Sequence, residues 1–242
     1  MSKQKVEYDE KAIKTLDALA HIRLRTGMYI GRIGDGANPN DGIYVLMKEI
    51  VDNSIDEFIM GVGKKVEITR DENTVTIRDY GRGIPLGKVV DCVSQINTGG
   101  KYNDDVFQFS VGLNGVGTKA VNALSAQFDV ISFREGAFKR ATFKQGKLIE
   151  IFKKFTWHDE FIAKRLKYYC YLNAGLAITY NGTTFQSKEG LKDLLATELG
   201  EEKTHYGVFH HREDKLEFAF SHTGIYGETY FSFVNGQYTN DG

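Results

Sequence analysis

The stretch Gly42-Ile-Tyr-Val-Leu-Met-Lys-Glu-Ile-Val-Asp-Asn-Ser-Ile-Asp-Glu-Phe-Ile-Met-Gly61 decides the fold that this sequence predicts. Its apolar residues recur at three- and four-residue spacing, which predicts an amphipathic helix that ends at the glycine. Glu49, Asn53 and Glu57 lie four residues apart and form a polar stripe beside the apolar one. We therefore expect a helix that is buried along one side and presents carboxylate and amide groups along the neighbouring side.

A hairpin follows this helix and ends in a turn that begins with a carboxylate. Residues 65–69 and 74–78 alternate between apolar and polar side chains, which is typical of two half-buried strands. Asp79 stands where the second strand ends, and it opens the glycine-bearing turn Asp79-Tyr-Gly-Arg-Gly-Ile-Pro85. The expected buried set of the hairpin is Val66, Ile68, Val75 and Ile77.

A long glycine-rich segment precedes the next predicted helix. The segment from Thr98 to Gly117 holds five glycines, and connections of this length in a compact domain are usually functional lids or disordered. It ends in Gly112-Leu-Asn-Gly-Val-Gly117. Residues 118–125 are then predicted as a helix, with Thr118 as its N-cap.

The remaining chain predicts a mixture of helices and strands with no internal repeat. Its length of 242 residues and hydrophobic content of 41% suffice for one sizeable core, with room for the beginning of a second unit. Further helices are expected over residues 17–25, 89–96, 160–171 and 188–199, and further strands over 128–133, 137–143, 175–180, 206–210, 215–221 and 228–234.

Bulk composition limits the class of protein. The formal net charge of −1 argues against nucleic-acid binding over the whole surface. Cys92 and Cys170 stand in unrelated contexts, so we expect two reduced, buried thiols rather than a disulfide or a metal site. The first residues lack the apolar region of a signal peptide, and no apolar run is long enough for a membrane span. A cytoplasmic protein with no membrane partner is expected.

The polar stripe of the helix predicted over 42–61 supplies two groups that nucleotide hydrolysis needs. A carboxylate such as Glu49 can orient an attacking water and accept its proton. Asn53 offers a neutral oxygen to Mg²⁺, a cation that takes few protein ligands and keeps waters and phosphate oxygens. An ordinary solvated acidic face is the alternative interpretation of this stripe.

The turn after the hairpin offers groups that suit a purine. The Asp79 carboxylate can accept a hydrogen bond from the exocyclic amino group of adenine. Gly81 and Gly83 allow the backbone to approach a flat ring, and Arg82 can pair with Glu57. The alternative is a strand-to-turn junction that uses aspartate and glycine only for its geometry.

The glycine-rich segment suits a phosphate group. The backbone amides of Gly112–Gly117 and the N-terminus of the next helix can form an anion site, and Gly99-Gly100-Lys101 adds a hinge and a cation. The Walker pattern is not met, because Gly117 is followed by Thr118-Lys119 in that order, and the dinucleotide pattern Gly-x-Gly-x-x-Gly is not met either. A flexible surface loop remains the alternative.

In this order, the three segments resemble those of the GHKL ATPases. This group includes type II topoisomerases, ninety-kilodalton heat-shock chaperones, MutL mismatch-repair proteins and sensor histidine kinases. Arg25-Thr-Gly-Met-Tyr-Ile-Gly31 and the segment 112–125 narrow the resemblance to the B subunits of bacterial type IIA topoisomerases, with topoisomerase IV favoured over gyrase. The implied fold is an α+β two-layer sandwich, in which a mixed β-sheet carries helices on one face and ATP lies between the sheet and a lid.

The resemblance also implies a role for individual residues. Glu49 would be the general base, Asn53 the magnesium ligand and Asp79 the adenine reader. Tyr8 would reach the nucleotide of a partner subunit. The adenine pocket would be walled by Ile50, Ser54, Ile77, Ile84 and Ile96, approached by Gly83, and rimmed by Glu57, Arg82, Pro85 and Arg134, which inhibitors contact. The phosphate lid and the helix after it would supply Gly99, Gly100, Lys101, Leu113, Asn114, Gly115, Val116, Gly117 and Thr118.

The resemblance implies partners as well. ATP binding would dimerise two B subunits, and the complete enzyme would act on duplex DNA together with an A subunit. The alternative from another class is an ATP-gated chaperone or mismatch-repair clamp of the same group, which acts on protein partners.

The sequence departs from the family pattern at three points. A family strand of the form Gly-Thr-x-x-x-Phe-x-Pro-Asp is missing after Glu150, and Asn114 stands where many relatives have histidine. Residues 1–220 are expected to form the ATPase domain, with an N-terminal arm over 1–15, and residues 221–242 to begin a transducer domain. The transducer lysine that would contact the γ-phosphate is not in this sequence, so we expect ATP binding with little turnover.

Overall fold

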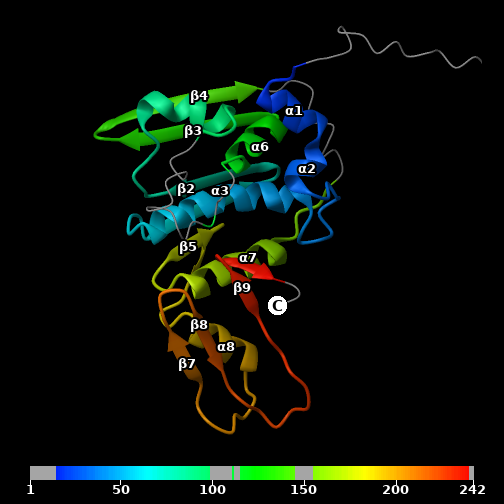
Figure 1. The fold of residues 1–242 in the computed structure, drawn as a ribbon, viewed down its shortest axis with the longest axis vertical. Coiled ribbons are helices and arrows are strands. Elements are labelled where there is room, and N and C mark those ends of the chain that lie inside the picture. Colours follow the sequence, from blue (N-terminus) through cyan, green and yellow to red (C-terminus); the bar gives the residue numbers. More distant parts are fainter. Residues whose placement is uncertain (1–14, 99–110, 112–114, 145–154, 240–242) are drawn as a thin grey trace, which may run out of the picture.

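Helix α3 (Gly42–Ile59) runs through the middle of the structure, and the other elements are arranged around it (Figure 1). The computed structural model describes residues 15–98, 111, 115–144 and 155–239 of the chain. The other helices are α1 (Ala18–Leu24), α2 (Thr26–Ile30), the 3-10 helix η2 (Leu86–Lys88), α4 (Val89–Ser94), α6 (Gly117–Leu124), α7 (Asp159–Leu172) and α8 (Leu191–Leu199). The strands are β1 (Lys65–Asp71), β2 (Thr74–Asp79), β3 (Gln127–Arg134), β4 (Ala137–Lys144), β5 (Ala177–Tyr180), β6 (Thr183–Gln186), β7 (Phe209–Arg212), β8 (Glu217–Phe220), β9 (Ser232–Val234) and β10 (Gln237–Thr239).

The central sheet has four strands in the order β2-β1-β5-β6. Strand β1 pairs antiparallel with β2, with Ile68 opposite Ile77, and parallel with β5, with Val66 opposite Ile178. Parallel neighbours require a crossover connection, and α7 lies in the connection that precedes β5. The β3–β4, β7–β8 and β9–β10 hairpins each form a two-stranded sheet of their own. This mixed sheet with packed helices confirms the expected α+β fold.

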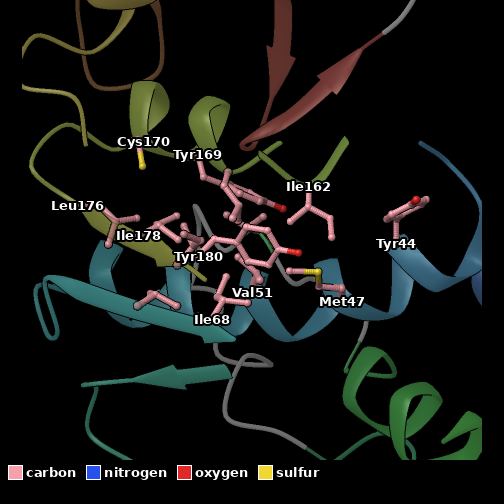
Figure 2. Close-up of a cluster of buried hydrophobic side chains, with 14 residues drawn as sticks. Tyr44, Met47, Val51, Ile68, Ile162, Tyr169, Cys170, Leu176, Ile178 and Tyr180 are labelled. Carbon is pink, nitrogen blue, oxygen red and sulfur yellow. The ribbon is translucent and has the colours of Figure 1, made fainter. Parts of the chain in front are cut away.

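The main hydrophobic core lies between helices α3 and α7 and strands β1 and β5 (Figure 2). Each element contributes residues at its own period: every third or fourth residue from the helices and every second residue from the strands. The buried members are Tyr44, Met47, Val51, Ile55, Val66, Ile68, Val111, Ile162, Leu166, Tyr169, Cys170, Leu176, Ile178 and Tyr180.

A second, smaller core lies on the other side of α3. It joins that helix to α1, α2 and α6 and contains Ile22, Ile30, Leu46, Ala120, Ala123 and Leu124. Because Leu46 belongs to this cluster and Met47 belongs to the main one, successive residues of α3 are buried in different cores.

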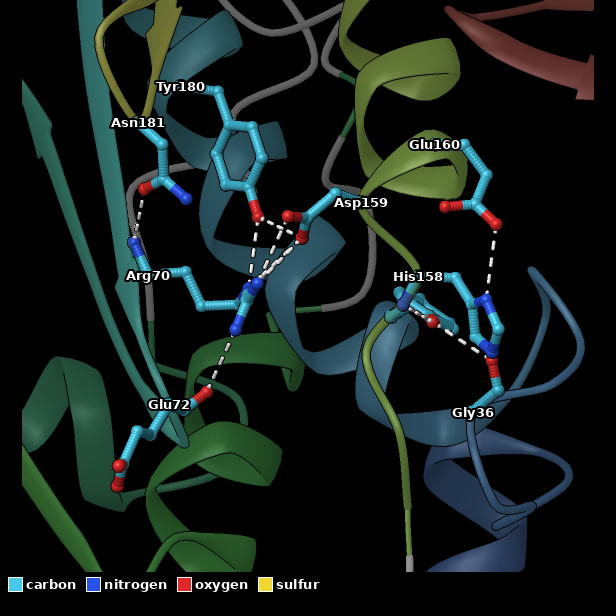
Figure 3. Close-up of polar contacts among 9 residues, drawn as sticks. Gly36, Arg70, Glu72, His158, Asp159, Glu160, Tyr180 and Asn181 are labelled. Carbon is cyan, nitrogen blue, oxygen red and sulfur yellow. Dashed lines mark hydrogen bonds and ion pairs between the residues drawn. The ribbon is translucent and has the colours of Figure 1, made fainter.

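A polar cluster fastens the sheet to the start of α7 (Figure 3). The Arg70 guanidinium on β1 donates to Asp159 Oδ1 at 2.8 Å, and the Tyr180 hydroxyl donates to the same oxygen at 2.8 Å. The Arg70 backbone N–H also donates to Asn181 Oδ1 at 2.8 Å. Asp159 lies in the first turn of α7, where the helix dipole favours a carboxylate. These contacts tie β1, the β5–β6 turn and α7 together.

Several local predictions were wrong. Helix α2 over residues 26–30 and strand β6 after the Asn181-Gly182 turn were not predicted. The predicted strand over 228–234 is restricted to its end, where β9 pairs with β10. Helix α6 begins at Gly117 with Val116 as its N-cap residue, so Thr118 lies inside the helix and does not cap it. The strand expected to be missing after Glu150 falls outside the described residues.

In the described part of the chain, no helix combines the length and the apolar character that a membrane span requires.

Candidate active site

The polar stripe of α3 faces the N-terminus of α6. Asn53 Nδ2 donates to the Glu49 carbonyl oxygen at 2.7 Å, within its own helix, and to Thr118 Oγ1 of α6 at 3.1 Å. These two contacts fix the orientation of the Asn53 amide and use its nitrogen. The structure therefore brings Glu49, Asn53 and Thr118 together.

The Glu49 carboxylate lies against the first residue of α6. A Cβ atom placed on Gly117 would be 1.9 Å from Glu49 Oε2 and 2.9 Å from Glu49 Cβ, so only glycine permits this approach. The N-terminal end of a helix carries partial positive charge and exposed N–H groups, which stabilise an anion. A negative group at this place can be the Glu49 carboxylate, the phosphate of a ligand, or both side by side.

The other end of the stripe holds the turn that follows β2. Glu57 Oε2 accepts from the Arg82 backbone N–H at 2.8 Å and from Arg82 Nε at 3.0 Å, and Glu57 Oε1 accepts from Arg82 Nη2 at 2.8 Å. This pairing raises the pKa of Arg82 above its ordinary value, because the Glu57 carboxylate favours the charged guanidinium. Asp79 Oδ1 accepts from the Gly81 N–H at 2.9 Å, which holds the carboxylate over its own turn. The predicted pair of Arg82 and Glu57 is confirmed.

The β3–β4 hairpin borders the same turn. A Cβ atom on Gly83, whose φ is +75°, would be 2.3 Å from the Phe133 carbonyl oxygen. Ser132 Oγ donates to the Ile84 carbonyl oxygen at 2.8 Å, and Arg134 Nη1 donates to the Gly83 carbonyl oxygen at 3.4 Å. Arg134 therefore lies beside the turn 79–85, where the sequence placed the rim of a pocket.

Some of the remaining predicted site residues lie in the described part of the chain, and the others lie outside it. Ser54 is buried, and its hydroxyl donates to the Ile50 carbonyl oxygen at 3.3 Å. Half-buried positions are held by Ile50, Ile77, Ile84, Ile96, Gly115 and Val116, whereas Asp79 and Pro85 are exposed. Tyr8, Gly99, Gly100, Lys101, Leu113 and Asn114 lie outside the described residues, so the expected lid and arm contacts stay predictions.

Sequence reasoning missed two buried polar residues that support this site from α6. Lys119 is 3% exposed, and its ammonium donates to the Thr98 carbonyl oxygen at 2.7 Å. Asn122 is fully buried, and its amide donates to the Val93 carbonyl oxygen at 2.9 Å. Both side chains hold the chain at the end of α4, where the glycine-rich segment begins. A lysine and an asparagine three residues apart in a short apolar helix were the available signal.

The groups around Asn53 suit a cation that takes most of its ligands from waters and phosphate oxygens rather than from the protein. Across residues 15–98, 111, 115–144 and 155–239, no three His, Cys, Asp or Glu side chains gather into a metal site. Asn53 carries an amide oxygen, which is one of the ligand types that such a cation takes. Mg²⁺ characteristically takes one or two protein oxygens together with waters and phosphate oxygens. The residues present fit such an ion and do not fit a closed structural metal site.

Comparisons with known proteins identify the family. Residues 38–155 match the family described as histidine kinase-, DNA gyrase B- and HSP90-like ATPase. The chain is similar to the B subunit of DNA topoisomerase 4 from Borreliella burgdorferi, with 57% identity over 256 residues, which span 97% of this chain and 43% of that protein. The B subunit of DNA gyrase from Mycoplasmoides gallisepticum is 30% identical over 99% of this chain and 45% of its own length.

A solved structure shows the same relationship. The crystal structure of the 43K ATPase domain of Thermus thermophilus gyrase B, in complex with an aminocoumarin, superposes with a TM-score of 0.71 and 25% identity, over 93% of this chain and 68% of that one. The fold and the site thus define an ATPase domain of the gyrase B and HSP90 class. Within this class, the chain belongs with the B subunits of type II topoisomerases. It spans less than half the length of the curated relatives it matches.

Proposed function

We propose that this chain binds ATP with Mg²⁺ along the polar stripe of α3 and hydrolyses it, with Glu49 as the general base. The observation that carries this proposal is the approach of the Glu49 carboxylate to the N-terminus of α6, beside Asn53. A base, an amide oxygen and a helix N-terminus in one place are the groups that a bound triphosphate uses.

The two ends of the stripe are separated by a distance that suits a nucleotide. Glu49 and Glu57 are eight residues apart, which corresponds to about 12 Å along the helix axis. The base and the α6 N-terminus would take the γ-phosphate at one end. Asp79 would accept from the adenine amino group at the other, close to the turn that Glu57 and Arg82 hold in place. Ile50, Ile77, Ile84 and Ile96 would supply the apolar walls for the ring.

Each group has a limited task in the reaction. Asn53 would ligate Mg²⁺ through its amide oxygen, and the bound ion would neutralise charge on the phosphate oxygens. Glu49 would hold the attacking water and accept its proton late in the reaction. The α6 N-terminus would stabilise negative charge without moving, because Lys119 and Asn122 anchor that helix.

The wider role follows from the relatives and is proposed on that basis. Nucleotide binding would dimerise two B subunits, and hydrolysis would reset a gate through which an enzyme completed by an A subunit passes duplex DNA. Residues 1–220 would form the ATPase domain and residues 221–242 the start of the transducer. The alignment with the Borreliella protein extends over 256 positions but covers 97% of this 242-residue chain, or about 235 residues, so about 21 of its positions have no counterpart here, which supports a missing element such as the strand after Glu150.

Calorimetry with a non-hydrolysable ATP analogue, with and without MgCl₂, tests the proposal. D79N should weaken binding by about ten- to a hundred-fold, because a hydrogen bond to a charged group contributes about 1.5–3 kcal/mol. E49Q should bind the analogue as wild type does but lose the phosphate release that wild type shows, however slow. The exposed Asp214 lies in a turn far along the chain, so D214N is the control. Wild-type affinity in D79N would overturn the adenine assignment, and failure of wild type to bind would overturn the function.

A further inference from the structure

A polar pocket lies between the end of α7, the beginning of α8 and the β7–β8 hairpin. Its volume is about 240 Å³, far more than the roughly 10–15 Å³ that a single water needs. Figure 1 shows α8 and the hairpin below α7, whereas α3 and α6 lie above it. The pocket therefore has no part in the proposed ATP site, and its chemistry needs an explanation of its own.

Four basic side chains line this pocket from two directions. Lys188 and Lys192 come from the segment that opens α8, and His210 and Arg212 come from strand β7. Two lysines and an arginine carry a permanent charge at neutral pH, whatever the state of the histidine. In the described part of the chain, no carboxylate forms an ion pair with the Lys188 ammonium. At least this cation is available to a ligand.

Two carboxylates of the pocket orient the other cations. Glu217 Oε1 is 2.9 Å from His210 Nε2, and Glu217 Oε2 is 3.7 Å from Arg212 Nε. Glu189 Oε1 is 3.7 Å from Lys192 Nζ. These contacts occupy only the Nε of the guanidinium, and across the described residues its two Nη groups make no hydrogen bond. Because three permanent cations face two carboxylates, the pocket keeps a positive charge and free donors.

The backbone groups at the start of α8 are already satisfied from within the chain. The N–H groups of Lys188 and Glu189 each donate to Asp193 Oδ2 at 3.0 Å, and the Ser187 hydroxyl donates to the same oxygen at 2.7 Å. The Gly190 N–H donates to Ser187 Oγ at 2.9 Å. An anion in the pocket would therefore be held by side chains and not by the helix terminus.

The walls of the pocket meet at Gly190. Its φ is +64°, and a Cβ atom placed on it would be 3.1 Å from the Tyr171 carbonyl oxygen and 3.5 Å from Glu217 Oε1. Glycine thus allows α7, α8 and β8 to approach one another at this point. The approach fixes the spacing between the lysines of the α8 segment and the guanidinium of β7.

We propose that this pocket binds a small phosphate-bearing anion, held by Lys188, Lys192 and Arg212. A guanidinium can donate to two phosphate oxygens at once, while ammonium groups attract the remaining oxygens as point charges. A phosphate group has enough oxygens for cations that arrive from two directions, whereas a carboxylate has only two. The bound anion would fasten the β7–β8 hairpin to the start of α8. The inference is independent of the proposed function.

Titration of the ¹⁵N-labelled protein with pyrophosphate in magnesium-free buffer tests the inference by NMR. The amide signals of Gly190, Lys192 and Arg212 should shift with one common dissociation constant. K188M and R212M should each raise that constant about ten-fold, because each removes a charge-assisted contact. Both side chains are exposed, so the variants should fold. K215M is the matched control, since Lys215 is exposed on the same hairpin outside the pocket, and it should change the constant less than about two-fold.

Each other outcome would overturn the inference. No shift at the pocket, or an equal loss of affinity in K215M, would show that no specific site exists there. Shifts confined to the amides of Asn53 and Gly117 would place the anion at the α3–α6 site instead. A short DNA duplex that binds with the same dependence on Lys188 and Arg212, while pyrophosphate does not bind, would make the DNA backbone the occupant. Loss of ATP-analogue binding with pyrophosphate still bound at the pocket would overturn only the proposed function.

Discussion

Replacing Gly117 with alanine tests the contact on which the proposed site depends. The added Cβ would lie 1.9 Å from Glu49 Oε2 and 2.9 Å from Glu49 Cβ. Carbon atoms in van der Waals contact are about 3.5–4.0 Å apart. The carboxylate can rotate away, but Glu49 Cβ moves only with the backbone of α3. Alanine must therefore displace Glu49 from the α6 N-terminus by about 0.6–1.1 Å, or separate the two helices by a similar amount.

The same substitution should lower activity strongly while the protein stays folded. Gly117 is the first residue of α6 and is not among the residues with positive φ, so alanine suits its backbone. The gain in helix propensity is about 0.5–1 kcal/mol, and overpacking costs about 1–3 kcal/mol. The free energy of unfolding should therefore fall by no more than about 2.5 kcal/mol. A catalytic group misplaced by 1 Å can lower the rate about a hundred-fold.

Urea unfolding, analogue binding and phosphate release measure the two effects separately. Gly27 lies in helix α2, and a Cβ atom added to it would meet no other atom within 4 Å, which makes G27A the matched glycine-to-alanine control. G27A should leave stability unchanged or slightly raised, with wild-type nucleotide binding. If G117A released phosphate at the wild-type rate, Glu49 could not be the base at this helix terminus, and the reasoning would fail.

Two further predictions concern the core around α3 and α7. Y169F removes a donor to the buried Asp52 and should lower the free energy of unfolding by about 1–3 kcal/mol in urea titrations. Y171F is the control: its hydroxyl contacts Thr197 at the surface, so it should lower the free energy of unfolding by less than about 0.5 kcal/mol. Equal losses in the two variants would contradict the Asp52 contact. Burial raises the pKa of Cys170 to about 12, so at pH 8 a disulfide reagent should modify the half-buried Cys92 in the native protein and reach Cys170 only on unfolding. Because the raised pKa favours the neutral thiol, this contribution to stability is present at neutral pH and is lost as the pH rises above the ordinary thiol value of about 8.5. Rapid modification of both thiols in folded protein would show that the core opens readily.

The sequence predicted those features that depend on spacing along the chain. The helical period of 42–61 placed Glu49, Asn53 and Glu57 on one stripe, and the structure keeps that stripe on α3. The β1–β2 hairpin was predicted from its alternation, and Asp79 ends the second strand as expected. The strands predicted over 128–133 and 137–143 leave Glu135-Gly136 between them, and both residues have the positive φ that a two-residue hairpin turn requires.

Features that depend on contacts between distant segments could not be predicted in this way. Gly117 and Glu49 are 68 positions apart, and no local sequence pattern indicates that position 117 must be glycine because Glu49 packs against it. Thr118 was expected to cap α6, but tertiary contact with Asn53 gives its hydroxyl a different partner. Strand β6 is four residues long, too short for alternation to stand out, and it exists because β5 offers it an edge.

The position of the polar stripe is a consequence of burial on both sides of α3. Val51 and Ile55 are 0–1% exposed in the main core, while Leu46 is buried in the cluster with α1, α2 and α6. Rotation of the helix about its axis would expose at least two of these side chains, at about 1.5–3 kcal/mol each. The helix can therefore neither turn Glu49 away from α6 nor bring another face toward the turn 79–85 without losing much of a typical domain's stability. Two separate cores thus fix the position of Glu49, the proposed base, relative to the N-terminus of α6.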